Sequence, residues 1–157
     1  SYGGRKDVRL RIHNAATMAG LSFTRAGLGL CHAMSHAMGG ILHLPHGRLN
    51  AILLPAVVQV NGSAAGSSYA ALARRAGLGG SAEVMAVRNL KNALIRLRRD
   101  LDMPDTLAQA GVSPIAVRSN SAALVQAVLA DPCCATNPTR VEDFMVRQVL
   151  EEVTGRG

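Results

Sequence analysis

Histidines are the residues best able to do chemistry in this sequence, and four of the five lie in one segment, CHAMSHAMGGILHLPHG, residues 31–47. The four are His32, His36, His43 and His46. On a helix, His32 and His36 would project from one face with their Cβ atoms about 5 to 6 Å apart, a separation that suits one metal ion. Neutral imidazole is a common metal ligand in proteins. The segment therefore predicts a metal site, and a set of core or capping histidines is the alternative.

The residues between these histidines predict how His46 could join the other two. Gly39 and Gly40 would end the first helix, since glycine commonly follows a helix end. Pro45 restricts the approach of the next segment because its ring fixes φ. His46 can then return toward the face that carries His32 and His36, so that the ligands come from two elements.

The elements that position these residues are expected to be helices, because the chain is poor in aromatic side chains. Its 157 residues include no Trp, two Phe and two Tyr, although 48% are apolar. Ala, Leu, Met and Arg lose little entropy in a helix, whereas strand-rich domains draw on β-branched and aromatic residues. We therefore expect an all-α fold, a bundle of six to eight helices in one domain spanning residues 1–157.

Apolar spacing and helix-ending residues predict where those helices lie. The clearest amphipathic helix begins after Ser81, the expected N-cap, and carries an apolar stripe. The stripe consists of Val84, Val87, Leu90, Leu94 and Leu97. We expect helices over residues 7–23, 30–38, 46–60 with a kink at Pro55, 67–78, 81–101, 113–131 opened by Ser113 and Pro114, and 139–155, with a turn and a short helix over 103–112.

The net charge of +7 and the pI near 10.4 invite a nucleic-acid function, which the distribution of charge disfavours. The basic residues are mostly arginines spread along the chain, and the main cluster is Arg96, Arg98 and Arg99. No aromatic side chain is interleaved with them to stack on bases. We interpret the cluster as a solvated helix face and expect no nucleic-acid partner.

The three cysteines indicate a reducing compartment, and the cytoplasm is the expected location. An odd count, with Cys133 and Cys134 adjacent, does not make a disulfide framework, so free thiols are expected. No segment offers the roughly 18 uninterrupted apolar residues of a membrane span, and the N-terminal residues lack the apolar run of an export signal. We expect no membrane association.

Longer motifs around the histidines resemble a known family. AGLSFTRAGLGLCHAMSHAMGGILHLPHGRLNAILLP, residues 19–55, is similar to the signature of the iron-containing (group III) alcohol dehydrogenases. LRRDLDMPDTLAQAGV and DPCCATNPTRVEDF resemble the late and closing segments of the same family. The resemblance spans nearly the whole chain and implies the C-terminal helical domain of the iron-containing alcohol dehydrogenase and dehydroquinate synthase-like fold.

The resemblance also implies a role for particular residues. His32 and His46 match the two metal-ligand histidines of the family's helical domain, so this pair replaces a His32–His36 chelate. His36 matches the histidine beside the nicotinamide that is implicated in proton relay. Phe23 and Cys133 match positions that contact the nicotinamide, whereas His43 matches no functional position and is expected in a solvated loop.

Two features of the family are missing from this sequence. Members have an N-terminal dinucleotide-binding domain, and their helical domain opens with an Asp and a His spaced D-x3-H that supply two further metal ligands. Neither feature is found in these 157 residues, since Asp7 and His13 are six positions apart. We therefore expect a piece of the family's fold that lacks the N-terminal domain and the start of the helical domain.

The resemblance implies a metal-dependent NAD(P)-linked alcohol dehydrogenase that interconverts alcohols and aldehydes with Fe²⁺ or Zn²⁺ as cofactor. The chain alone is expected to be inactive, and the missing domain is its expected partner. The alternative is a truncated, non-catalytic helical module that binds or assembles. Removing one domain should expose an apolar patch and promote a homo-oligomer. The alcohol, the metal and the choice between NAD and NADP are left open.

Overall fold

A computed structural model describes residues 5–155, and its regular elements are all helices in that range. They are α1 (Lys6–Ala26), α2 (Leu30–Leu42), α3 (His46–Val60), α4 (Gly62–Arg75), α5 (Glu83–Asp100), α6 (Pro114–Ser119), α7 (Ser121–Ala130), the 3-10 helix η2 (Pro132–Thr136) and α8 (Asp143–Thr154). The all-α prediction is confirmed.

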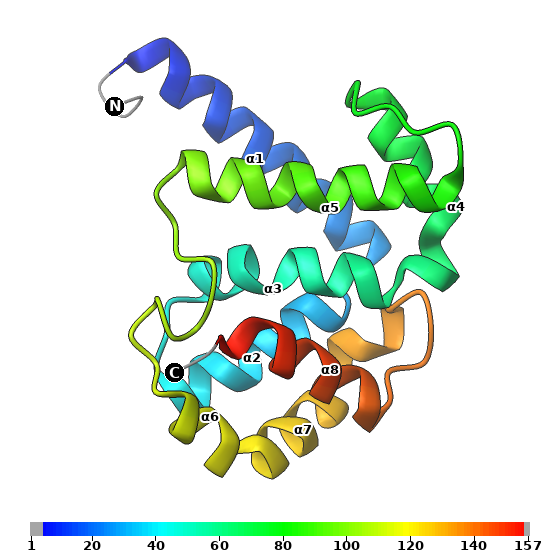
Figure 1. The fold of residues 1–157 in the computed structure, drawn as a ribbon. Coiled ribbons are helices and arrows are strands. Elements are labelled where there is room, and N and C mark those ends of the chain that lie inside the picture. The colour runs from blue at the N-terminus through cyan, green and yellow to red at the C-terminus, as the bar shows by residue number, and fades with distance from the viewer. Residues whose placement is uncertain (1–4, 156–157) are drawn as a thin grey trace.

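The main core surrounds α2 and α3. Figure 1 shows α3 between α5 on one side and α8 on the other, and α2 also contacts α7. The largest fully buried side chains here are Leu, Ile, Val and Met, packed with small alanines such as Ala33 and Ala56. These large side chains include Leu30, Met34, Met38, Leu49, Ile52, Leu53, Leu124, Val125, Val128, Val146 and Val149.

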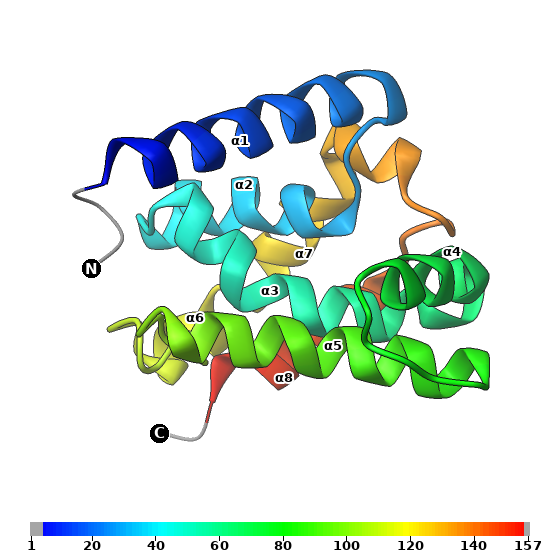
Figure 2. The same cartoon turned by 90° about the horizontal axis from the view of Figure 1, so that it is seen from above.

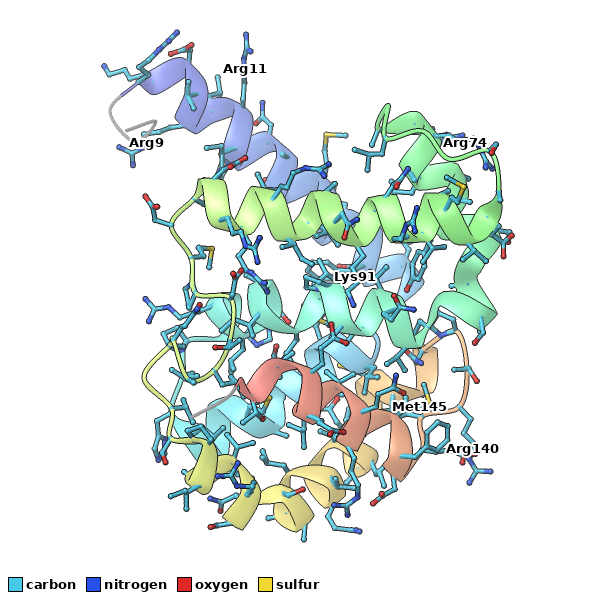
Figure 3. All side chains as sticks on the ribbon, viewed as in Figure 1. Arg9, Arg11, Arg74, Lys91, Arg140 and Met145 are labelled. Carbon is cyan, nitrogen blue, oxygen red and sulfur yellow. The ribbon has the colours of Figure 1, made fainter. Side chains whose placement is uncertain are left out.

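An ion pair also joins α5 to α8 on the outside of the molecule. Lys91 of α5, labelled in Figure 3, lies with its Nζ 2.7 Å from Oε1 of Glu152 in α8.

A smaller core lies between α4 and α5. It contains Val58, Ala70, Ala73, Ala86, Val87 and Leu90. The predicted apolar stripe of α5 is therefore right at its centre and wrong at its ends, because Val84 and Leu97 are exposed. Small alanines in α4 allow that helix to pack closely on α5, but they leave little apolar area to cover the whole stripe.

Arg98 corrects the interpretation of the arginine cluster as a solvated face. Its side chain is only 8% exposed, and its guanidinium pairs with Asp105 at 2.8 Å. One nitrogen, Nη1, donates to the carbonyl oxygens of Ala51 and Ile52 at 3.3 and 3.2 Å. Pro55 has no N–H to donate to the Ala51 carbonyl four residues earlier. Arg98 therefore satisfies the carbonyl that Pro55 leaves free inside α3.

Two other local predictions, the cap of α5 and the short helix within 103–112, were wrong. Ala82 rather than Ser81 occupies the N-cap position of α5, without a side-chain cap. Residues 103–112 form turns and no helix. The N–H groups of Leu107 and Ala108 donate to the carbonyls of Val153 and Thr154, at the end of α8, instead of to a helix of their own.

The predicted helix over 113–131 is two helices that meet at Asn120. Asn120 serves both as the C-cap of α6 and as the N-cap of α7. Its side chain donates to the Ala116 carbonyl at 2.8 Å, a local bond that competes with the helical ladder. The prediction for Ser113 is confirmed, since its hydroxyl accepts the Ile115 N–H with Pro114 at the first helical position.

Helix α1 differs from every other long helix because none of its 21 residues is buried. Figure 2 shows it lying over α2, on the side of α2 away from α5. Its exposed apolar residues are Leu10, Ile12, Met18, Leu21 and Phe23. Arg9 and Arg11 lie at its outer end (Figure 3). Within residues 5–155, no other element buries a side chain of α1.

No single helix in residues 5–155 is long and apolar enough to cross a membrane. Helices α3 and α4 reach the required length and composition together, but they meet at an angle of 111°. Most of the apolar side chains of α3 are buried in the main core.

Candidate functional site

Three histidines meet where α2 faces the start of α3. His32 and His36 project from α2, and His46 is the first residue of α3. The ring centroids of His32 and His46 are 5.2 Å apart, and those of His36 and His46 are 5.1 Å apart in a stacked arrangement. The return of His46 to the face of α2 is therefore present in the structure.

The chain makes this return through a tight connection. His43 follows α2 in the left-handed conformation, with φ of 55°, and its N–H donates to the Gly39 carbonyl at 3.1 Å. Pro45 follows as the N-cap of α3. His43 is exposed, in agreement with its predicted place in a solvated loop.

The imidazoles of His32 and His46 point at the same atom. Asn50 lies one turn after His46, and its Nδ2 is 2.9 Å from Nε2 of His46 and 3.5 Å from Nε2 of His32. Its Oδ1 accepts the hydroxyl of Ser35 at 2.6 Å and the thiol of Cys31 at 3.5 Å. In this arrangement both Nε2 atoms accept, so their lone pairs converge on one point. Such a pair suits two ligands of a single ion.

The surroundings of His32 favour the neutral form of its imidazole. Partial burial lowers the pKa of His32 below 6.5, and the nearby His46 and His36 lower it further, against a weaker opposing effect of Asp131. A neutral ring is the form that binds metals. Two neutral imidazoles do not offset the charge of a divalent ion, so a complete site needs further ligands.

His36 is held by a carboxylate that the sequence analysis did not single out. Its Nδ1 lies 2.9 Å from Oδ2 of Asp131. Burial opposes ionisation of Asp131, but the Cys133 N–H and His36 together bring its pKa below 3.8. An ionised carboxylate only accepts hydrogen bonds. Nδ1 of His36 therefore carries the proton, and the lone pair of the neutral ring is on Nε2.

Cys133 lies beside this pair on η2. Asp131 caps η2 through Oδ1, which accepts the Cys133 N–H at 2.8 Å. Partial burial, followed by a side-chain hydrogen bond with Asp131 and by the charge of that carboxylate, raises the pKa of the Cys133 thiol to about 11. All three cysteines are free thiols in the structure.

Contacts between distant segments hold η2 against the histidine helices. Oδ1 of Asn137 accepts the Leu30 N–H at the start of α2 at 3.1 Å. The amides of Asn137 and Asn61 donate to one another at 2.9 and 3.0 Å, and Asn61 is buried. This amide pair joins η2 to the end of α3.

The C-terminal end of α1 packs against η2, and this contact places Phe23 beside His32. The Phe23 and His32 ring centroids are 6.1 Å apart. Gly27 follows α1 with φ of 77°, and a Cβ there would come within 2.5 to 2.6 Å of the Thr136 side chain. The Thr136 hydroxyl donates to the Leu28 carbonyl. Only glycine allows η2 to approach the chain so closely.

The structure thus gathers all five residues that the sequence singled out, from α1, α2, α3 and η2. They are Phe23, His32, His36, His46 and Cys133. The sequence analysis missed Asn50 and Asp131, although both occur in the quoted motifs NAILLP and DPCC. A hollow of about 860 Å³ lies elsewhere, beside the start of α8, and no histidine lines it.

Known proteins resemble this chain over almost all of its length. Residues 1–154 match the family described as Fe-containing alcohol dehydrogenase family, C-terminal. The NADPH-dependent butanol dehydrogenase of Clostridium saccharobutylicum is 31% identical over 96% of this chain and 39% of its own length. The 1-propanol dehydrogenase of Salmonella typhimurium is 36% identical over 92% of this chain and 40% of its own length.

Solved structures show the same relationship. A 1,3-propanediol oxidoreductase superposes with a TM-score of 0.88 at 28% identity, covering 96% of this chain and 39% of the other. An alcohol dehydrogenase from Oenococcus oeni also gives 0.88, at 27% identity and with the same coverage. The chain spans about two fifths of these proteins. It belongs to the iron-containing alcohol dehydrogenase family and has the fold of that family's C-terminal helical domain.

Proposed function

We propose that this chain is the metal-binding helical domain of an NAD(P)-linked alcohol dehydrogenase that interconverts alcohols and aldehydes. One observation carries the proposal: Phe23, His32, His36, His46 and Cys133, from four separate elements, lie together. The relatives named butanol and propanol dehydrogenases act on small alcohols, which supports this substrate class. Because the chain spans about two fifths of those relatives, we propose that a dinucleotide-binding domain outside these residues supplies the rest of the cleft.

His32 and His46 are the proposed metal ligands in this chain. An Fe²⁺ or Zn²⁺ ion bound there would act as a Lewis acid on the alcohol oxygen and lower the pKa of its hydroxyl. Bound NAD or NADP would accept the hydride. Asn50 holds both Nε2 atoms facing one point, so the imidazoles need little reorientation to bind an ion.

His36 is the proposed proton carrier. Asp131 fixes the proton on Nδ1, which leaves Nε2 free to accept a proton from the reacting alcohol or from water. Phe23 lies beside His32 and Cys133 lies beside His36, and both are the proposed contacts of the nicotinamide. The Cys133 thiol, with its raised pKa, stays neutral and does not compete as a nucleophile. Free thiols also fit the proposed cytoplasmic location.

The test is an Fe²⁺ titration under anaerobic conditions, paired with an NAD(P)-linked alcohol oxidation assay. We expect weak Fe²⁺ binding by the 157-residue chain, loss of that ion in a His32→Ala, His46→Ala double variant, and no turnover by either. His43→Asn is the matched control, because Asn tolerates the left-handed conformation at that position. Unchanged Fe²⁺ binding by the double variant would refute the ligand pair. Turnover above that of the double variant would refute the incomplete site.

A free-standing helical module that binds or assembles is the second candidate. The uncovered apolar side chains of α1 favour it, since such surfaces commonly mark interaction sites. The intact mass of the protein purified from its natural source separates the two functions. A mass near 16.4 kDa would support the module, and a mass about 2.5 times larger would support the dehydrogenase.

A further inference from the structure

We propose that His36, Asp131 and Cys133 form a second metal site, which takes Zn²⁺ and uses neither His32 nor His46. One ligand atom from each of the three side chains lies within 4.8 Å of the others. His36 comes from α2, and the other two come from the start of η2. Asp131 lies 95 residues after His36 in the sequence. The set combines nitrogen, oxygen and sulfur donors, each of which zinc accepts.

The fold holds these donors in place without an ion. Asp131 makes two bonds, one to the Cys133 N–H at 2.8 Å and one to His36 at 2.9 Å. The Asn137 contacts fix η2 against α2. In a tetrahedral zinc site, donor atoms are about 3.3 to 3.7 Å apart, given metal–ligand distances of about 2.0 to 2.3 Å. Closing the set around an ion therefore needs side-chain shifts of roughly 1 Å and no change of fold.

The charges of this set suit a divalent ion better than those of the His32–His46 pair. A carboxylate and a thiolate together supply two negative charges, whereas two neutral imidazoles supply none. Before binding, the Cys133 thiol is protonated and Nδ1 of His36, the ring nitrogen beside Asp131, carries a proton. Zinc binding at these atoms forms Zn–S and Zn–N bonds, releases the thiol proton to solvent and moves the imidazole proton to Nε2 through solvent. Sulfur and imidazole ligands also select zinc over Mg²⁺ and Ca²⁺.

The site is open to an ion from solvent. The His36 side chain is 44% exposed, and Asp131 and Cys133 are partly exposed. Three protein ligands leave the fourth tetrahedral position to water. The consequence for the enzyme rests on the proposed function: an ion held by His36 and Cys133 would occupy the place of the nicotinamide, so zinc would inhibit by excluding the cofactor.

The experiment is a titration of the 157-residue chain with Co²⁺, a spectroscopic substitute for zinc. A bound thiolate gives a near-ultraviolet charge-transfer band, which the all-nitrogen pair of His32 and His46 does not produce. We expect one such band per chain, displaced by Zn²⁺. Cys133→Ser should abolish it, and Cys134→Ser is the matched control that should keep it. His36→Ala and Asp131→Asn should each weaken Co²⁺ binding by roughly tenfold or more.

The variants remain informative about the fold. Asn is a good N-cap, so Asp131→Asn preserves the cap of η2 while removing the charge. Circular dichroism would show that each variant keeps its helices. A wild-type chain without the band, or a band that is lost in Cys134→Ser and kept in Cys133→Ser, would overturn the proposal.

The Co²⁺ titration tests the zinc site independently of the Fe²⁺ titration that tests the His32–His46 pair. A band that persists in the His32→Ala, His46→Ala double variant supports the zinc site whatever the Fe²⁺ titration shows. Co²⁺ binding without a band, abolished in that double variant, would overturn the zinc site and leave the ligand pair standing. Cys133→Ser also serves as the background in which Fe²⁺ binding at His32 and His46 can be measured alone.

Discussion

Helices α1 and α2 are neighbours in the sequence, and both carry apolar residues at helical spacing, yet their surroundings are opposite. Seven of the 13 residues of α2 are buried, and none of the 21 residues of α1 is. Helix α2 contacts α3, α7 and η2, whereas α1 is held mainly where it ends, beside Thr136. Periodicity therefore predicts that a helix has an apolar face, but it does not tell which other element covers that face.

The largest expected difference between the two helices concerns a matched pair of methionines. Met34 of α2 is fully buried and Met18 of α1 is 68% exposed. Met34→Ala should lower the free energy of unfolding by about 2 to 5 kcal/mol, because it leaves a cavity in the main core. Met18→Ala should change it by less than about 0.5 kcal/mol. Urea denaturation followed by circular dichroism measures both.

Equal losses of unfolding free energy in Met34→Ala and Met18→Ala would contradict the contrast between a buried α2 and an exposed α1. They would mean that Met18 is covered in solution, by α1 repacking on the body or by another copy of the chain. Repeating the measurement at several protein concentrations distinguishes these cases, since only association makes the stability concentration-dependent.

Much of the fold and of the candidate site could be predicted because the signals are local. The proline before His46 marks the start of α3 as predicted. The predicted helix end at Gly39 and Gly40 is wrong, because α2 continues through both glycines to Leu42 and ends at the left-handed His43. Asn50 and Asp131 could not be assigned in the same way. Asn50 contacts His46 four residues away, but its contact with His32 spans 18 residues, and Asp131 contacts His36 across 95 residues. No local pattern encodes these two longer contacts.

The same limit explains the errors elsewhere. The Arg98 side chain is directed inward by the Ala51 carbonyl that Pro55 leaves free, and the sequence shows the proline without showing which donor reaches that carbonyl. Residues 103–112 have helical composition, but their amides pair with the end of α8 instead. In both cases a contact between distant segments decides the local structure.

Arg98 offers the next largest effect. Arg98→Met should lower the free energy of unfolding by roughly 2 to 3 kcal/mol, because it leaves the Ala51 carbonyl and Oδ1 of Asp105 without a donor. Arg96→Met, two residues earlier on the exposed side of α5, is the matched control and should stay within about 0.5 kcal/mol. Similar losses for both would restore the solvated-face interpretation of the cluster.

Asp105 gives a smaller, pH-dependent effect in the same place. Burial raises its pKa, but hydrogen bonds from Arg99 and Arg98 outweigh this and bring the pKa below 3.8. A lowered folded-state pKa stabilises the fold above the unfolded value and loses that contribution as the pH falls through the folded value. The stability difference between the wild-type chain and Asp105→Asn should therefore be full at pH 6 and shrink below about pH 4.

The control for this pH series is Asp102→Asn. Asp102 is exposed, with φ of 53°, and makes no ion pair among the salt bridges of residues 5–155. Asn tolerates this conformation, so the substitution removes a carboxylate without adding strain. A difference for Asp105→Asn that stays constant down to pH 2 would contradict the role of its charge.

The smallest free energies are expected for local opening of α1. With 21 residues it exceeds the roughly 12 to 15 residues below which isolated helices are marginal, so it should stay partly helical without a partner. The hydroxyls of Thr17, Ser22 and Thr24 donate to carbonyls four residues earlier, which slightly destabilises a helix. Amides near the start of α1 should therefore exchange through openings that cost only about 0 to 1 kcal/mol, whereas those of α2 should require global unfolding.

Hydrogen exchange resolved by residue measures how the protection of backbone amides changes along α1. Protection should rise toward Phe23, because Gly27 and Thr136 hold that end of the helix against η2. Protection of the whole of α1 equal to that of α2, and independent of protein concentration, would show that α1 packs on its own chain in solution. Protection that disappears on dilution would instead show that a second copy of the chain covers the apolar side chains of α1. That copy would then cover α1 as α3 and α7 cover α2.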